Sequence, residues 1–177
     1  MGDKAIEQII EHRPFNTIEE FLFHDKIVYS KLNKKALDVL VRSEALSSLM
    51  DSRFENLKHF WKAVAAYRPK KAAKLVENIE EYKDTKDYTK KQRIENLAGL
   101  TGLYPFRLVI SDDVVSRLKR GDIPPLSEYD PAAQVTWFIP RNILVKKTKN
   151  GKSYWIVECI DVAGGTTSIK CWGIDPR

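Results

Sequence analysis

The sequence predicts an α+β protein, with a mainly helical N-terminal region followed by a small antiparallel β unit. Apolar residues recur at helical spacing through the first 121 residues. The dipeptides Pro124-Pro125 and Asp130-Pro131 then mark a linker, and beyond it apolar and polar residues alternate as in strands. We therefore divide the chain into helical regions 1–68 and 69–121, a linker 122–134 and a β unit 135–177.

Four helices are expected in the first 68 residues. The first has apolar residues on one face and ends at Arg13-Pro14, because proline disfavours a helical residue before it. The capping patterns Thr17 to Glu20 and Ser52 to Glu55 predict the starts of the second and fourth helices, and Asn33 can cap the third.

Residues 69–121 are also expected to be helical. Two apolar stripes lie between Lys70 and Leu103, and the polar stretch Asp84 to Lys90 separates them. A further short helix is predicted after Ser111, with a basic last turn and a glycine stop at Gly121.

Three strands are expected in the β unit. Residues 135–145 are rich in β-branched and aromatic side chains, and Asn150-Gly151 is a strong hairpin signal before the alternating residues 154–162. Gly164-Gly165 turns the chain into a third strand, Thr166 to Trp172. Three strands leave open edges, so we expect an incomplete sheet.

The composition favours a basic, soluble and intracellular protein. Thirty basic residues against twenty-four acidic ones give a net charge of +6, and such an excess favours polyanions where it is clustered. The largest cluster is Arg141 to Lys152, which contains no acidic residue. No apolar run approaches the length of a membrane span, so no membrane partner and a cytoplasmic location, in a bacterial cell or an infected host, are expected.

No catalytic or metal site is expected. Cys159 and Cys171 lack the spacing of a zinc site and are interpreted as reduced structural thiols. Asp112-Asp113 is interpreted as the acidic first turn of a helix rather than as a catalytic pair. The three histidines, His12, His24 and His59, are interpreted as surface or half-buried residues.

The first candidate site is a phosphate cradle at two helix starts. A helix N-terminus presents unpaired N–H groups and a partial positive charge, so lysines beside it favour an anion. The alternative is that these lysines are merely solvated at exposed helix starts. The candidate residues are Gly2, Lys4, Asn33, Lys34 and Lys35.

The second candidate site combines the basic hairpin with aromatic residues on neighbouring strands. Basic loops beside stacking aromatics are typical of β-barrels that hold single-stranded nucleic acid. The alternative is a solvated hairpin tip with the aromatics in the core. The candidate residues are Arg141, Lys146, Lys147, Lys149, Lys152, Trp155 and Trp172, with Tyr154 beside them.

The order of these segments resembles the family C DNA polymerases, the replicative DNA polymerase III alpha subunits of bacteria and some phages. Four segments carry the resemblance: Gly2-Asp3-Lys4-Ala5-Ile6, Pro14-Phe15, Glu20-Phe21-Leu22 and Leu32-Asn33-Lys34. Leu100 to Pro105 is similar to an element of the family's helical connector. The chain departs from the family at Glu44-Ala45, where the family usually has glycine-alanine and a left-handed helix end favours glycine.

The resemblance implies a tandem helix-hairpin-helix region over residues 1–68, a helical connector over 69–121 and a partial oligonucleotide-binding (OB) fold over 135–177. It also implies non-sequence-specific DNA binding, with duplex primer-template on the helices and the template single strand on the β unit. No cofactor is expected in this chain, since the catalytic magnesium of such a polymerase is held in another part of the polypeptide. The implied protein partners are the rest of the polymerase or other replisome proteins.

Two alternatives remain. The helices from Ser52 to Gly121 can form a protein-interaction module of a replication complex, with the basic residues serving only solubility. The chain can also be a small stand-alone nucleic-acid-binding protein.

Overall fold

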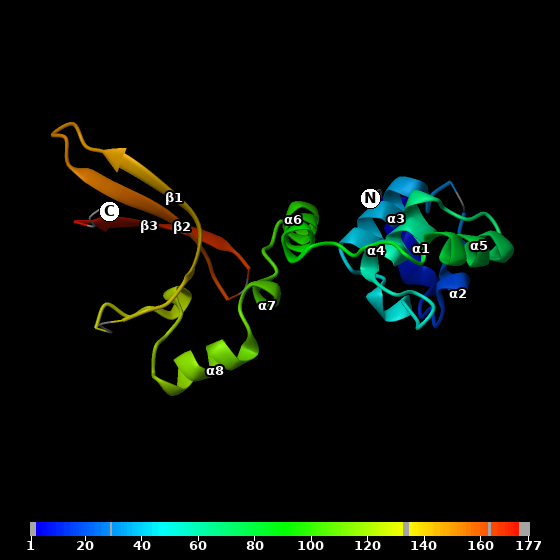
Figure 1. The fold of residues 1–177 in the computed structure, drawn as a ribbon, viewed down its shortest axis with the longest axis horizontal. Coiled ribbons are helices and arrows are strands. Elements are labelled where there is room, and N and C mark those ends of the chain that lie inside the picture. Colours follow the sequence, from blue (N-terminus) through cyan, green and yellow to red (C-terminus); the bar gives the residue numbers. More distant parts are fainter. Residues whose placement is uncertain (1–2, 29, 133–134, 163, 174–177) are drawn as a thin grey trace. The chain divides into compact units, whose positions relative to one another are not determined.

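The chain folds into two compact units, Met1–Thr101 and Gly102–Arg177. The computed structural model describes residues 3–28, 30–132, 135–162 and 164–173, and Figure 1 labels the elements of each unit. The predicted α+β class is confirmed. The division falls ahead of the predicted linker at 122–134, because residues 102–121 belong with the sheet. The amide of Tyr104, for example, donates to the carbonyl of Gly164 at 2.9 Å.

The described residues of the N-terminal unit form helices joined by turns and loops. A π-helical turn, Lys62–Ala66, continues directly from α4. The α-helices of this unit are α1 (Asp3–His12), α2 (Ile18–Phe23), α3 (Lys34–Arg42), α4 (Leu57–Trp61), α5 (Ala72–Tyr82) and α6 (Lys90–Thr101).

Two predicted caps are confirmed and a third is wrong. Thr17 Oγ1 accepts from the amide of Glu20 at 3.1 Å, and Asn33 Oδ1 accepts from the amide of Ala36 at 3.0 Å. The predicted capping box at Ser52 to Glu55 starts no helix. The carboxylate of Asp51 accepts from the amide of Arg53 and holds a turn there, so α4 starts only after Asn56, which caps it.

The core of the N-terminal unit joins the apolar faces of its helices. Phe54 and Phe60 meet edge to face, with ring centroids 4.8 Å apart. The residues with no more than 1% exposure in this core are Ile18, Phe21, Leu32, Leu37, Val41, Phe60, Ala63, Val64, Ala65 and Leu75.

Two buried polar residues tie α5 to the preceding helical turns. Asn78 Nδ2 donates to the carbonyls of Ala63, at 3.0 Å, and Tyr67, at 2.6 Å. His59 is fully buried, which corrects its interpretation as a surface or half-buried residue. Its Nδ1 accepts from the amide of Glu55, so Nε2 carries the proton and donates to the carbonyl of Ile79.

The end of α3 has the left-handed conformation that glycine would favour. Glu44 occupies this position with φ 61°. Ser43 is the C-cap, and the amide of Ala45 donates to the carbonyl of Leu40 at 3.0 Å. The left-handed helix end therefore forms with glutamate instead of glycine.

The C-terminal unit contains α7 (Phe106–Val109), α8 (Asp112–Arg120) and the strands β1 (Ile139–Lys147), β2 (Ser153–Ile160) and β3 (Thr166–Trp172). The strands form an antiparallel sheet in the order β1-β2-β3. The predicted hairpin is confirmed, with Gly151 at φ 78° between β1 and β2.

Two predicted boundaries differ in this unit. Strand β1 begins at Ile139 rather than residue 135, because Trp137 pairs with the segment Pro124–Leu126 instead of with β2. Helix α8 ends before Gly121 as predicted, but Gly121 has φ −86°. The left-handed residue is the next one, Asp122, with φ 55°.

Across the ranges that the structure describes, no helix has the length and apolar character needed to cross a membrane.

Candidate nucleic-acid interface

The register of the sheet sorts its side chains into two faces. Residues directly opposite each other on antiparallel strands share a face, and successive residues alternate between faces. Tyr154 lies opposite Lys146 on β1 and opposite Trp172 on β3. We call the part of this side nearest the hairpin the aromatic face, and it comprises Leu144, Lys146, Tyr154, Ile156, Lys170 and Trp172, with Glu158 further along the same side.

Tyr154 and Trp172 form a stacked pair on the aromatic face. Their ring centroids are 4.5 Å apart and their planes differ by 18°. Trp172 is 57% exposed, although tryptophan is usually well buried. The pair therefore presents a flat aromatic surface to solvent.

Trp155 lies on the opposite face of the sheet from Trp172. It stands between Val145 on β1 and Cys171 on β3, and its indole Nε1 is buried without a hydrogen-bond partner among the described residues. The sequence-based hypothesis grouped Trp155 with Trp172 as stacking residues, and the alternation along β2 separates them. Tyr154 is the aromatic partner of Trp172.

The lysines around the hairpin differ in position. Lys146 is on the aromatic face, whereas Lys147 lies opposite Ser153 on the other face. Lys149 and Lys152 are exposed beside the turn. The structure brings only Lys146 of the four predicted hairpin lysines onto the face that carries the stacked pair.

Lys170 is a candidate that the sequence-based analysis missed. It lies opposite Ile156, two residues before Trp172 on β3, and therefore shares the aromatic face. Side chains alternate between the two faces of a strand, so the spacing of two residues between Lys170 and Trp172 was the signal that places both on one face. Residues 139–173 contain six lysine and arginine residues and only two acidic ones, so this sheet is positively charged.

Arg141 is held by contacts within the C-terminal unit. It lies at the β-bulge between Pro140 and Asn142, and its Nη1 donates to Glu158 Oε1 at 2.9 Å. Its guanidinium stands 4.4 Å from the centroid of the Tyr104 ring. These contacts compensate its charge, so Arg141 is a weaker phosphate ligand than the prediction assumed.

The N-terminal candidate residues are only partly brought together. Lys4 and Asn33 line one hollow of about 590 Å³, together with Lys31, Asp3 and Glu7. The two carboxylates offset the two lysines, and Asn33 Oδ1 already accepts from the amide of Ala36. This hollow is therefore not strongly cationic.

The other N-terminal candidates have different surroundings. Lys34 and Lys35 are exposed in the first turn of α3. Gly2 lies outside the described residues.

No group of three or more histidine, cysteine, aspartate or glutamate residues is placed to hold a metal ion within the described residues. Both cysteines are free, and burial raises the pKa of the Cys159 thiol. His12 and His24 stack with ring centroids 5.0 Å apart, a contact that the sequence did not predict. The best-formed candidate is therefore a binding surface, the aromatic face.

No protein family, curated protein or solved structure matches the chain.

Proposed function

We propose that this chain binds DNA without sequence specificity and that the aromatic face holds single-stranded DNA. The observation that carries this proposal is the exposed, stacked pair of Tyr154 and Trp172. Every nucleobase has a flat π-surface, so an unpaired base can stack on such a platform whatever its identity. An exposed tryptophan on an open sheet face otherwise leaves apolar area in water.

The charges around the stacked pair suit the phosphates of a single strand. Lys146 and Lys170 share the aromatic face with the pair, and the exposed Lys149 and Lys152 extend the positive charge to the hairpin turn. Lysine contacts to phosphate position a nucleic acid but carry no sequence information. Stacking together with lysine charge therefore supports binding that tolerates any sequence.

The proposal extends to duplex DNA on the N-terminal unit. Its support is the resemblance of the segments around Lys4 and Lys34 to the helix-hairpin-helix region of family C DNA polymerases, together with the exposed lysines at the start of α3. In this proposal, residues 1–68 bind the primer-template duplex and residues 135–177 act as a partial OB fold. The chain then serves as the DNA-binding part of a replicative polymerase.

Fluorescence anisotropy with a labelled oligothymidylate of about 20 nucleotides tests the sheet. We expect Trp172→Ala to weaken binding about tenfold, since one stacked base contributes about 1–3 kcal/mol. Tyr129→Ala is the matched control, because Tyr129 is a 45% exposed aromatic residue of the same unit outside the sheet. Equal affinities of the two variants would contradict the assignment of the aromatic face.

Salt and sequence dependence test the mode of binding. Affinity for the single strand is expected to fall with salt, with a log–log slope of about −0.7 for each phosphate contact. Mixed-sequence strands are expected to bind as tightly as oligothymidylate. Absence of binding to single strand, duplex and primer-template at low salt would overturn the proposal and favour the protein-interaction module.

Duplex binding is tested separately with Lys4→Glu, Lys34→Glu and Lys35→Glu combined in one variant. We expect this variant to lose affinity for duplex while keeping its affinity for oligothymidylate. Unchanged duplex affinity would contradict the role proposed for the N-terminal unit and leave the role of the sheet intact.

A further inference from the structure

Strand β1 has an open edge. Among the described residues, β2 is the only strand that pairs with β1, so the N–H and C=O groups on the outer side of β1 face no other strand. The bulge between Pro140 and Asn142 disrupts the first part of the strand. The regular open edge is therefore Asn142–Lys147, which is long enough for about six residues of a further strand.

This edge is apolar on both faces of the sheet. Ile143 and Val145 point to one face and Leu144 to the other, and their exposed fractions are 47%, 55% and 49%. Exposed edge strands are normally protected by charges, proline or bulges. Here proline and the bulge stand before Asn142, and Lys146 and Lys147 follow Val145, so Ile143–Val145 itself carries no such protection.

The opposite edge of the sheet has a different character. Strand β3 begins with the exposed polar residues Thr166, Thr167 and Ser168. The two edges belong to the same sheet and have the same neighbour, β2. The exposed apolar run Ile143–Val145 therefore has no counterpart in the first half of β3.

The charge of the β1 edge indicates what can cover it. Its basic residues are Arg141, Lys146 and Lys147, and β1 contains no acidic residue. Two copies paired antiparallel about Val145 would bring the Lys146 residues of the two copies diagonally together. Like charges across strands are destabilising, so an acidic strand fits this edge better than a second copy.

We propose that Asn142–Lys147 is a docking edge for an extended, acidic segment of another protein. The segment adds as an antiparallel fourth strand, so its main chain hydrogen-bonds to β1. Its central apolar residues pack beside Ile143, Leu144 and Val145, and its acidic N-terminal residues meet Lys146 and Lys147. This inference does not rest on the proposed DNA binding, because the stacked pair plays no part in it, although both proposals use Lys146.

A synthetic peptide of sequence Glu-Glu-Val-Thr-Val-Thr-Val, labelled with fluorescein, tests the proposal with the full chain. Two control peptides isolate the two contributions. In one, lysine replaces both glutamates, and in the other, alternate backbone amides are N-methylated. We expect both controls to bind at least about tenfold more weakly by fluorescence anisotropy, because one loses charge complementarity and the other loses strand hydrogen bonds.

A matched pair of variants locates the peptide on the sheet. Val145→Asp and Thr167→Asp place the same charge on exposed positions of the same face, one on each edge. We expect Val145→Asp to weaken peptide binding about tenfold and Thr167→Asp to leave it unchanged. Circular dichroism of both variants checks that the sheet is retained.

Amide hydrogen exchange shows directly which strand the peptide covers. In the proposal, the acidic peptide slows exchange in residues 142–147 and leaves residues 166–172 unchanged. The proposal would be overturned if all three peptides bound equally or if the acidic peptide did not bind. It would also be overturned if the peptide slowed amide exchange in β3 instead of β1. Sedimentation as a dimer that Val145→Asp converts to a monomer would also overturn it, because a second copy would then cover the edge.

Discussion

Arg93 on α6 holds Glu44 at the end of α3 through two hydrogen bonds. Its Nε donates to Oε1 at 2.9 Å, and its Nη2 donates to Oε2 at 2.8 Å. Glu44 has φ 61°, in the region that favours glycine. The ion pair therefore provides a reason for a glutamate to occupy a position where its backbone is strained, and it ties α6 to α3.

We expect Glu44→Gly to change the free energy of unfolding little, because two effects oppose each other. Glycine relieves a left-handed strain of about 1 kcal/mol, while the lost ion pair costs about 1 kcal/mol at a half-buried site. Arg93→Ala alone is expected to destabilise the chain by about 1 kcal/mol. Urea unfolding compares the natural chain with Glu44→Gly and Arg93→Ala. The double variant, Arg93→Ala in the Glu44→Gly background, is the control. A second loss of equal size there would show that Arg93 does not act through Glu44.

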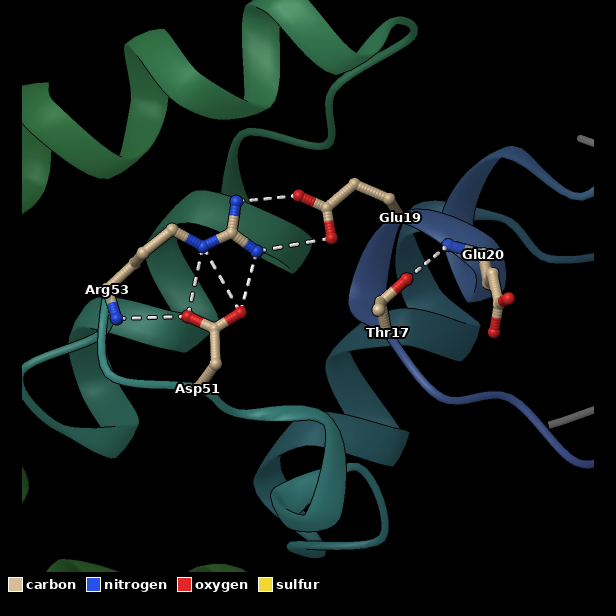
Figure 2. A network of polar contacts seen from close by, with 5 residues as sticks. All are labelled: Thr17, Glu19, Glu20, Asp51 and Arg53. Atoms are coloured by element: carbon tan, nitrogen blue, oxygen red, sulfur yellow. Dashed lines mark hydrogen bonds and ion pairs between the residues drawn. The ribbon is translucent and has the colours of Figure 1, made fainter.

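The ion pairs of Arg53 predict a loss of stability in acid. Arg53 bridges Glu19 and Asp51, as Figure 2 shows, with Nη1 2.7 Å from Glu19 Oε1 and Nη2 2.6 Å from Asp51 Oδ2. Hydrogen bonds from Arg53 hold the pKa values of both carboxyl groups below their ordinary values. Their stabilising contribution is therefore present near neutral pH and is lost as the pH falls below about 5 through the folded pKa values.

Urea unfolding of the natural chain and of Arg53→Met between about pH 7 and pH 3 checks this prediction. We expect Arg53→Met to be less stable near pH 7 and the difference to shrink towards pH 3. The difference should be small and salt-sensitive, because all three side chains are at least one-third exposed. A difference that stays constant with pH would count against this network.

Gly164→Ala is expected to disrupt the contact between Tyr104 and the turn before β3. A Cβ at residue 164 would clash with the carbonyl oxygen of Tyr104, and φ is 86°. Gly151→Ala is the matched control, with φ 78° and no atom within 4 Å of its Cβ. Gly151→Ala should lower the free energy of unfolding by about 1 kcal/mol through backbone strain alone. Gly164→Ala should lower it by at least about 1 kcal/mol more. Thermal unfolding that is equal in the two variants would contradict the close approach.

Asn78→Ala is expected to destabilise the N-terminal unit by about 2–3 kcal/mol. It leaves the buried carbonyl of Ala63 and the part-buried carbonyl of Tyr67 without their side-chain donor. Asn142→Ala, at an exposed position of β1, serves as the control and should change stability by less than about 0.5 kcal/mol. Chemical denaturation followed by circular dichroism measures both. A loss below about 1 kcal/mol in Asn78→Ala would mean that water replaces the amide.

Much of the local structure was predictable because it depends on residues three or four positions apart. The caps at Thr17 and Asn33 and the hairpin at Asn150-Gly151 formed as predicted. The capping box at Ser52 failed for a local reason, the competing turn that Asp51 makes with Arg53. Such competition is hard to predict, because both arrangements satisfy the same backbone donors.

The candidate site was predictable in composition and not in geometry. The sequence indicated basic and aromatic residues around the hairpin, and Lys146 and Trp172 do share a face. It placed Trp155 with them and omitted Lys170, because the faces of a sheet depend on the register between strands. A shift of one residue exchanges the two faces.

The sequence by itself determined the α+β class, the helix starts after Thr17, Asn33 and Ser111, and the strand order along the chain, because these follow from periodicity and from hydrogen bonds between near neighbours. Only the tertiary structure decided the left-handed Glu44, the Arg141 contacts with Glu158 and Tyr104, and the placement of residues 102–121 with the sheet. Each of these depends on side chains or backbone groups far apart in the chain. Their energies arise only once folding has brought those groups together.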